Sequence, residues 1–168
     1  MGSSAINYKY STTSQLSLQK EMKKFYTTIQ RAVVYLEASD FGMVRCISCG
    51  MWVSIKDADG GHGEGKGRNI KLARYRWNIH AQCRRCNRFK DGNTGAWYSG
   101  VREFFGEENY QYLKDMVRAS KGDLEAAERI LPEDRAKYIE KKWTASDYRE
   151  ERLKWEQVIK NNKYKEEF

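Results

Sequence analysis

The chain has 168 residues, of which 40% are hydrophobic and 32% are charged, and its mean hydropathy is −0.87. This length fits one domain, or one domain with an appendage. No apolar run approaches the roughly 20 residues that a membrane span needs, which excludes an integral membrane protein. Because no export signal is visible, we expect a cytoplasmic protein with reduced cysteines and no membrane partner.

The basic charge lies in one stretch of the chain. The net charge is +8, yet nine basic residues and no acidic residue lie between residues 66 and 90, and the rest of the chain is nearly balanced. A run of one sign favours a polyanionic partner, most simply a nucleic acid, over a merely solvated surface. The predicted contacts are Lys66, Arg68, Lys71, Arg74, Arg76, Arg84, Arg85, Arg88 and Lys90.

The first 41 residues divide into a polar part and an amphipathic part. Residues 1–14 are rich in Ser and Thr and have no apolar period, so we expect a disordered leader. Within residues 15–41, apolar residues from Leu18 to Leu36 recur at steps of three and four. This spacing predicts a helix whose apolar stripe packs on the core that follows.

Two Cys-x-x-Cys pairs come next, Cys46 with Cys49 and Cys83 with Cys86. Each pair directs two thiolates at one point, and two pairs complete a tetrahedral shell, so we predict a structural Zn²⁺. Two disulfides are the alternative, but the spacing and the lack of an export signal favour zinc.

The cysteine pairs lie in a predicted core at residues 42–106, followed by a helical C-terminal region at residues 107–168. In the core we expect strands at residues 51–55 and 75–81 and a helix from about Cys83. The glycine-rich stretch at 57–67 is not expected to be regular throughout, but it leaves room for a strand end or a tight turn near His62. In the C-terminal region, apolar spacing, a cap at Asp123 and a capping box at residues 144–147 predict helices. Its aromatic residues favour core or dimer contacts over a ligand site.

Five further polar residues of the core are not needed for zinc: Asp59, His62, Asn78, His80 and Asn87. A neutral imidazole is a suitable base near pH 7, and Asp and Asn oxygens suit Mg²⁺ or Mn²⁺. Hydrolysis of a phosphodiester needs both a base for water and a hard cation for the phosphate. The residues therefore favour a nuclease.

Several motifs carry a resemblance to a known family. They are Leu18-Gln19-Lys20, Cys46-Ile47-Ser48-Cys49-Gly50, Gly61-His62, Asn78-Ile79-His80-Ala81-Gln82-Cys83-x-x-Cys86-Asn87, Gly92-Asn93, Phe105-Gly106-Glu107-Glu108 and Trp143-Thr144-Ala145-Ser146-Asp147. From about residue 15 to residue 160, the chain resembles the lambdoid phage NinG (Rap) family of recombination nucleases. Its core looks like an HNH (ββα-metal, His-Me finger) nuclease and is similar to phage recombination endonuclease VII.

The resemblance implies an α+β fold. A small zinc-bound, HNH-like treble-clef core would be flanked by an N-terminal helix and several C-terminal helices. It also implies a structure-selective, metal-dependent endodeoxyribonuclease that cuts branched recombination intermediates of a phage, such as Holliday junctions and D-loops. Such an enzyme would act on branched or duplex DNA in the bacterial host cytoplasm, at the nucleoid.

By position in the family pattern, His62 would be the general base and Asn78 the residue that holds the His62 loop. Asp59 and Asn87 would bind the catalytic Mg²⁺ or Mn²⁺, and the four cysteines the zinc. Many HNH nucleases have an acidic residue directly before the base, where this chain has Gly61.

Family relatives also often carry His where this chain has Asp59, and these two departures make Asp57 a second candidate ligand. His80 has no assigned role, and a strand histidine hydrogen-bonded to a neighbour is the simpler interpretation.

Two other functions remain open at this point. A non-catalytic zinc-dependent module that binds nucleic acid would need the cysteines and arginines, but not Asp59, His62 and Asn87 together. A protein-interaction domain built on the helical C-terminal region would leave the basic stretch unexplained. Junction resolution needs two symmetric cuts, which favours a homodimer.

Overall fold

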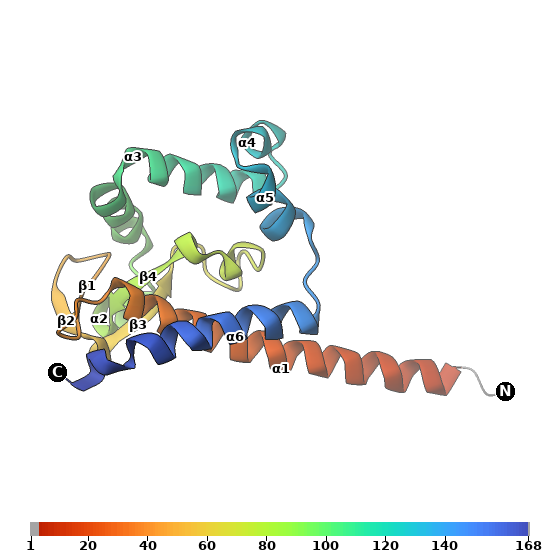
Figure 1. Cartoon of the computed structure of the whole chain (residues 1–168). Helices are drawn as coiled ribbons and strands as arrows, with labels where there is room; N and C mark the ends of the chain where they lie inside the picture. The colour runs from red at the N-terminus through yellow and green to blue at the C-terminus, as the bar shows by residue number, and fades with distance from the viewer. Residues whose placement is uncertain (1–3, 168) are drawn as a thin grey trace.

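The structure is a computed structural model that describes residues 4–167, with side chains from residue 14. The fold is α+β, as predicted, and mostly helical with two small antiparallel sheets. Figure 1 shows three layers, with the strands between two layers of helices. One helical layer contains α1 (Ser4–Glu37) and α6 (Ala145–Asn162); the other contains α3 (Thr94–Ser120), α4 (Leu124–Arg129) and α5 (Pro132–Asp134).

Helix α1 begins at Ser4, so the disordered leader predicted at residues 1–14 is wrong for residues 4–14. Residues 1–3 lie outside the described part. A helix that is already nucleated gains a backbone hydrogen bond with each added residue, so the packed half of α1 extends into the polar segment. The predicted apolar stripe is confirmed at Phe25, Ile29 and Val33, which are fully buried, but not at Leu36, which is 44% exposed.

Helix α6 lies beside α1 and runs in the same direction (Figure 1). Tyr148 at its start packs edge-to-face on Phe25, with ring centroids 5.5 Å apart. The predicted capping box is present, with Thr144 accepting from the backbone N–H of Asp147 and the Asp147 carboxylate accepting in return. At Tyr148 the prediction of a core contact is therefore confirmed.

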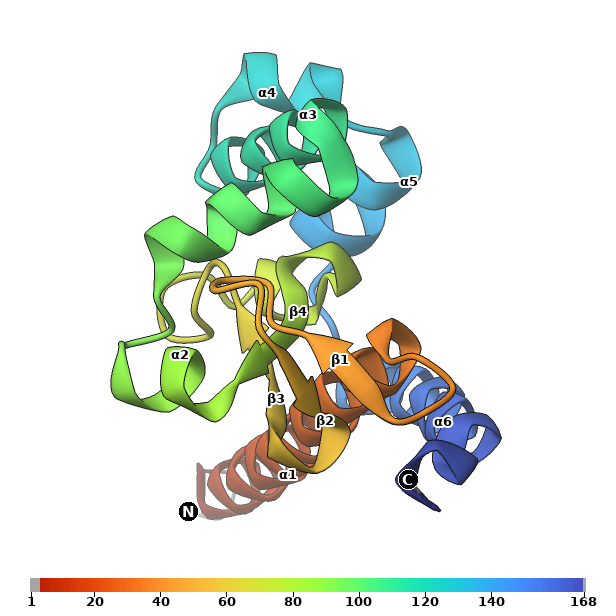
Figure 2. The ribbon, with the colours of Figure 1, turned by 90° about the vertical axis from the view of Figure 1, so that its left-hand side faces the viewer.

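The strands form two hairpins. β1 (Met43–Arg45) pairs with β2 (Trp52–Ser54), and β3 (Ala58–His62) pairs with β4 (Ile79–Cys83). Helix α2 (Arg84–Phe89) follows β4 directly and lies against the second hairpin, at the left of Figure 2. The helix predicted from about Cys83 is thus confirmed.

The strand predicted at residues 75–81 begins only at Ile79. Two 3₁₀ turns, Leu72–Arg74 and Arg76–Asn78, precede it, because the backbone there bends to bury Leu72 and Tyr75. In the glycine-rich stretch at residues 57–67, the strand end expected near His62 is confirmed as the end of β3, and the strand extends back to Ala58.

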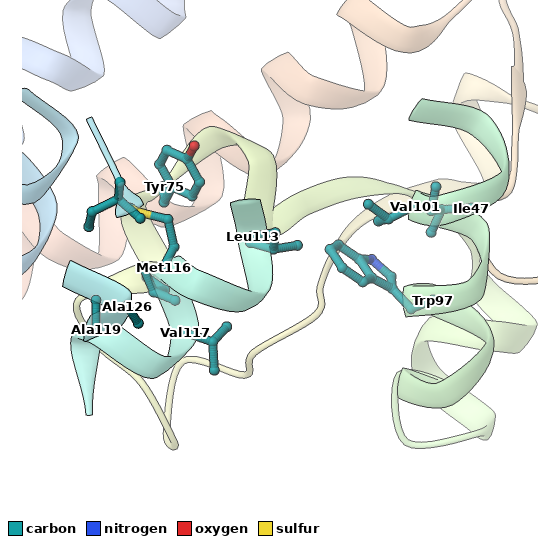
Figure 3. Close-up of a cluster of buried hydrophobic side chains, with 11 residues drawn as sticks. Ile47, Tyr75, Trp97, Val101, Leu113, Met116, Val117, Ala119 and Ala126 are labelled. Atoms are coloured by element: carbon teal, nitrogen blue, oxygen red, sulfur yellow. The ribbon is translucent and has the colours of Figure 1, made fainter. Parts of the chain in front are cut away.

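Helix α3 bends at Gly106, whose φ of 87° is outside the helical region. Figure 3 shows the cluster under its two halves, with Trp97 and Val101 from the first half and Leu113 and Met116 from the second. The predicted cap is confirmed at α4, where the Asp123 carboxylate accepts from the N–H of Ala126 at 3.0 Å. Among the described residues, no helix combines the length and apolar character required to cross a bilayer.

Candidate functional site

The four cysteines meet where the two hairpins approach each other. Their sulfurs all lie within 4.8 Å of one another, and none forms a disulfide. The sulfurs of Cys49 and Cys83 are 3.8 Å apart. A tetrahedral zinc site with Zn–S bonds of about 2.3 Å places its sulfurs about 3.8 Å from one another. The geometry and the thiol donors therefore fit the predicted zinc and not the two disulfides.

Burial raises the pKa of the Cys49 thiol to about 12, with the neighbouring Cys46 acting in the same direction. Burial also acts to raise the pKa of Cys46, but backbone N–H donors around it lower the pKa overall. Four thiolates this close repel one another, and a divalent cation is the group that relieves the repulsion.

A groove of about 380 Å³ runs between α1, β3 and α2. Its charged lining contains four cationic side chains and a single carboxylate: Arg31, Lys56, Arg84, Arg88 and Asp59. Helix α1 approaches β3 closely here, since a Cβ at Gly60 would lie 2.5 Å from the backbone oxygen of Gln30. Only glycine fits at this position, which explains part of the glycine-rich sequence.

Asp59 and Asn87 meet in the groove. The Asn87 amide donates to the Asp59 carboxylate at 3.2 Å. Arg88 also holds Asp59 through two hydrogen bonds of 2.7 and 2.8 Å. Burial would raise the pKa of Asp59, but the hydrogen bonds and charge of these neighbours lower it. The carboxylate is therefore ionised near neutral pH, as a cation ligand must be.

His62 lies at the end of β3, on the strand face opposite to Asp59, because side chains alternate along a strand. Its Nε2 donates to the backbone oxygen of Ala73 at 3.1 Å, which leaves Nδ1 with the lone pair. The Gln30 amide lies 3.5 Å from Nδ1, at the limit of a hydrogen bond. Burial lowers the pKa of His62 to about 4, and the charge of Lys66 contributes to the lowering.

Asn78 is fully buried and joins the two ends of the His62 loop, residues 63–77. Its amide nitrogen donates to the backbone oxygens of Glu64 at 3.0 Å and Leu72 at 2.9 Å. Its oxygen accepts from the N–H of Glu64 at 2.8 Å. Leu72 precedes Ala73, the acceptor of His62, so Asn78 holds the chain one residue before the carbonyl that orients the imidazole.

Position 61 faces Asn87 and Gln82. A Cβ at Gly61 would lie 1.7 Å from the Gln82 side-chain oxygen and 3.2 Å from that of Asn87. The Gln82 amide occupies the space of an acidic side chain, held by its donation to Ser48 at 2.7 Å and to the Gly92 carbonyl at 2.6 Å.

The second candidate ligand, Asp57, is paired with Arg84 at 2.9 Å on the exposed surface. His80 is fully buried, and its Nδ1 donates to Glu37 at 2.7 Å. For His80, the interpretation as a strand histidine bonded to a neighbour is confirmed.

Two of the nine predicted DNA contacts serve the fold. Arg74 is buried and donates to the backbone oxygens of Tyr138 at 3.2 Å and Lys141 at 3.0 Å, so its prediction as a DNA contact is wrong. Arg76 donates to Glu37 at 3.0 Å and is largely buried. The other seven are exposed or half-buried: Lys66, Arg68, Lys71, Arg84, Arg85, Arg88 and Lys90.

Sequence reasoning missed the residues that α1 contributes. Gln30 and Arg31 line the groove, and Glu37 at the end of the helix holds His80 and Arg76. The helical period predicts which of these side chains share a face of α1, but nothing local indicates that this face meets β3.

Comparisons with known proteins give one match. The family model described as Bacteriophage Lambda NinG protein matches residues 6–143. The resemblance was expected over residues 15–160, so the match starts nearer the N-terminus and stops 17 residues earlier. No curated protein and no solved structure matches the chain. The match spans most of the chain, including the four cysteines and the groove, and the chain therefore belongs to the family of the bacteriophage lambda NinG protein.

Proposed function

We propose that this chain is a structure-selective DNA endonuclease with an HNH-like core, which hydrolyses phosphodiesters in branched recombination intermediates. The observation that carries the proposal is the groove itself. It combines an Asp59–Asn87 pair, four cationic side chains and a neighbouring neutral histidine. A β-hairpin followed by a short helix, with cysteines at the helix start, is also the element order expected of an HNH core.

The donors in the groove fit a hard divalent cation, because Asp59 supplies an ionised carboxylate and Asn87 an amide oxygen. Mg²⁺ or Mn²⁺ held there would neutralise charge on the phosphate and on the leaving oxygen. Arg88 now pairs with Asp59, and it is free to exchange that carboxylate for a phosphate oxygen.

His62 is suited to accept the proton of the attacking water. Its Nε2–H is held by the Ala73 carbonyl, so the lone pair is on Nδ1. As the water oxygen bonds to phosphorus, its proton passes to Nδ1 and the bond from phosphorus to the leaving oxygen breaks. Gln30 covers Nδ1 at 3.5 Å while its amide donates to the Gly60 carbonyl at 2.7 Å, so water reaches Nδ1 only when the Gln30 side chain leaves that hydrogen bond.

The alternative is a zinc-dependent module that binds nucleic acid without cutting it. One observation favours it, namely that Arg88 holds both oxygens of Asp59 and so neutralises the carboxylate. A binder uses the same groove for phosphate but has no need of His62.

The substitution His62→Ala separates the two. For the nuclease, cleavage of labelled four-way junctions should fall by about 100- to 10,000-fold, the usual contribution of a positioned acid or base. Affinity for the same junction and zinc content should be unchanged, because one neutral ring adds little to phosphate attraction. Gln30→Ala, which uncovers Nδ1, is the matched variant and should retain cutting. Equal cutting by His62→Ala and the unsubstituted chain would refute the assignment.

A further inference from the structure

A second cavity, of about 250 Å³, lies on the other side of β4, between this strand and helices α3 and α5. Aromatic side chains form most of its wall: Tyr75, Trp77, Phe105 and Tyr112. Ligand pockets in proteins usually measure about 300–1,000 Å³, so this cavity suits a single planar ring system. Nothing in the proposed cutting reaction uses it.

His80 borders the cavity and carries a buried nitrogen with no partner. The side chain is fully buried, its Nδ1 donates to Glu37, and its Nε2 has no hydrogen-bond partner among the described residues. The Phe105 ring stacks on the imidazole with centroids 4.6 Å apart, which fixes its orientation. The cavity therefore borders on an imidazole nitrogen whose hydrogen-bonding capacity is unused.

The polar groups at the cavity wall also favour a ligand with N–H donors. Asp134 accepts from the hydroxyls of Tyr112 at 2.8 Å and Tyr75 at 3.4 Å through one carboxylate oxygen, Oδ2. Asn109 adds an exposed amide. A planar ring with an exocyclic amine satisfies these acceptors while its faces meet aromatic walls.

The hollow beside the cavity shares its aromatic side chains and contains one exposed cation. Arg45 and Arg76 line it together with Trp77, Phe105 and two carboxylates, Glu37 and Glu103. Arg76 is held by Glu37, whereas Arg45 pairs at 3.5 Å with Glu103, which is also exposed, so this second pair is weak and exchanges readily for a phosphate. A ring in the cavity would therefore have Arg45 beside it for its own sugar-phosphate.

We infer that this cavity binds one unpaired nucleobase of DNA, taken out of the helix at a branch point. The inference rests on the proposed action on branched DNA and deepens it, because fully paired duplex offers no free base and a branch does. Trp77, which is 44% exposed, lines the cavity and stacks on the base, and the Asp134 carboxylate accepts from its exocyclic amine.

The test compares a duplex containing one unpaired adenine with the same duplex containing an abasic residue there. Without added divalent cation, we expect the unsubstituted chain to bind the adenine form about 10-fold more tightly, the usual size of a base–aromatic stack. Trp77→Ala should reduce this ratio to about one and leave the abasic affinity unchanged. Trp52→Ala is the matched control, since Trp52 is also exposed but lies on β2, away from the cavity, and should keep the ratio.

A second measurement places 2-aminopurine at the unpaired position, where stacking on Trp77 should quench its emission. A ratio of about one in the unsubstituted chain, with duplex still bound, overturns the base pocket and leaves the nuclease proposal standing. An unchanged ratio in Trp77→Ala overturns it as well. A chain that binds no DNA overturns both proposals.

Discussion

The two histidines lie on paired strands, with His62 opposite Ile79 and His80 opposite Gly61, yet their surroundings differ in every respect. His62 is partly exposed beside a basic groove, and a backbone carbonyl holds its Nε2. His80 is fully buried among aromatic rings, and a carboxylate holds its Nδ1. The groove therefore adjoins His62 through Gln30, and the aromatic cavity adjoins His80.

The two histidines show how the hydrogen-bond acceptor of an imidazole affects its chemical role. A carbonyl orients His62 without adding negative charge, so burial keeps the ring neutral and Nδ1 available as a base. Glu37, in contrast, fixes His80 together with Arg76 and the N–H of Ala81, and this network joins the end of α1 to β4. Under the nuclease proposal His62 is the residue that reacts, whereas His80 holds the fold and borders the cavity.

Removal of zinc should have the largest effect on stability, and it should affect the first hairpin and α2 first. The metal would join the first hairpin to the start of α2, which carries Asn87 and Arg88. Apparent zinc affinities in zinc-finger peptides correspond to about 10–16 kcal/mol, so chelation or Cys83→Ser should strongly lower the melting temperature.

Hydrogen exchange measures where the loss occurs. Protection should fall first in the first hairpin and α2, while the contact between α1 and α6 is retained longest. Re-addition of zinc is the control, and metal analysis should find about one zinc per chain. An unchanged melting temperature after complete chelation would contradict the structural role.

Asn87→Ala tests the cation in the groove. Loss of even an outer partner of a bound metal usually costs about 10- to 100-fold in affinity or activity, so this ligand should cost at least that at limiting Mg²⁺. Raised Mn²⁺ should restore part of the cleavage, while zinc content and junction affinity stay the same. Asn161→Ala in α6 is the matched control and should cut normally. Full cleavage by Asn87→Ala without added Mg²⁺ or Mn²⁺ would exclude the proposed ligand.

Glu37→Ala tests the other side of the sheet. It leaves His80, Arg76 and the N–H of Ala81 without their acceptor, and we expect a loss of about 2–3 kcal/mol in the free energy of unfolding. For a chain of this size that lowers the melting temperature by about 4–12 °C.

Glu103→Ala is the matched control for Glu37→Ala, because the exposed pair of Glu103 with Arg45 should be worth little. Cleavage by the folded Glu37→Ala protein should stay within a few fold. A stable Glu37→Ala protein that fails to cut would assign this network to catalysis instead.

What the sequence predicted correctly is set by local geometry. Three features depend on spacings within a few residues and can be predicted from the sequence alone. They are the Cys-x-x-Cys pairs, the cap at Asp123 and the capping box at Thr144. The Asp59–Asn87 contact was expected only from the resemblance, and the structure brings the two side chains together.

What the sequence did not predict depends on long-range packing. Glu37 meets His80 across 43 residues and Gln30 meets His62 across 32, and both contacts follow from where α1 lies on the second hairpin. Arg74 has the residue type and the neighbours of a DNA contact, and only the position of the segment before α6 shows that it is buried. The start of α1 at Ser4 follows because the packed part of the helix extends toward the N-terminus, an effect that the composition of residues 4–14 does not indicate.

The smallest expected effect concerns the pH dependence that the buried imidazole of His62 confers on stability. The unfolded chain takes up a proton on this histidine below about pH 6.5, whereas the folded chain takes it up only near the lowered pKa of about 4. Between these values the unfolded state binds more protons, so stability falls as the pH drops, by at most about 1.4 kcal/mol per pH unit for one group.

His62→Gln should remove this contribution. Urea unfolding between pH 7 and pH 5 measures it as the difference between the two proteins, because the other titrating groups are common to both. A constant difference across that range would show that His62 titrates alike in both states, and the general-base assignment would then lose the neutral, buried imidazole on which it depends.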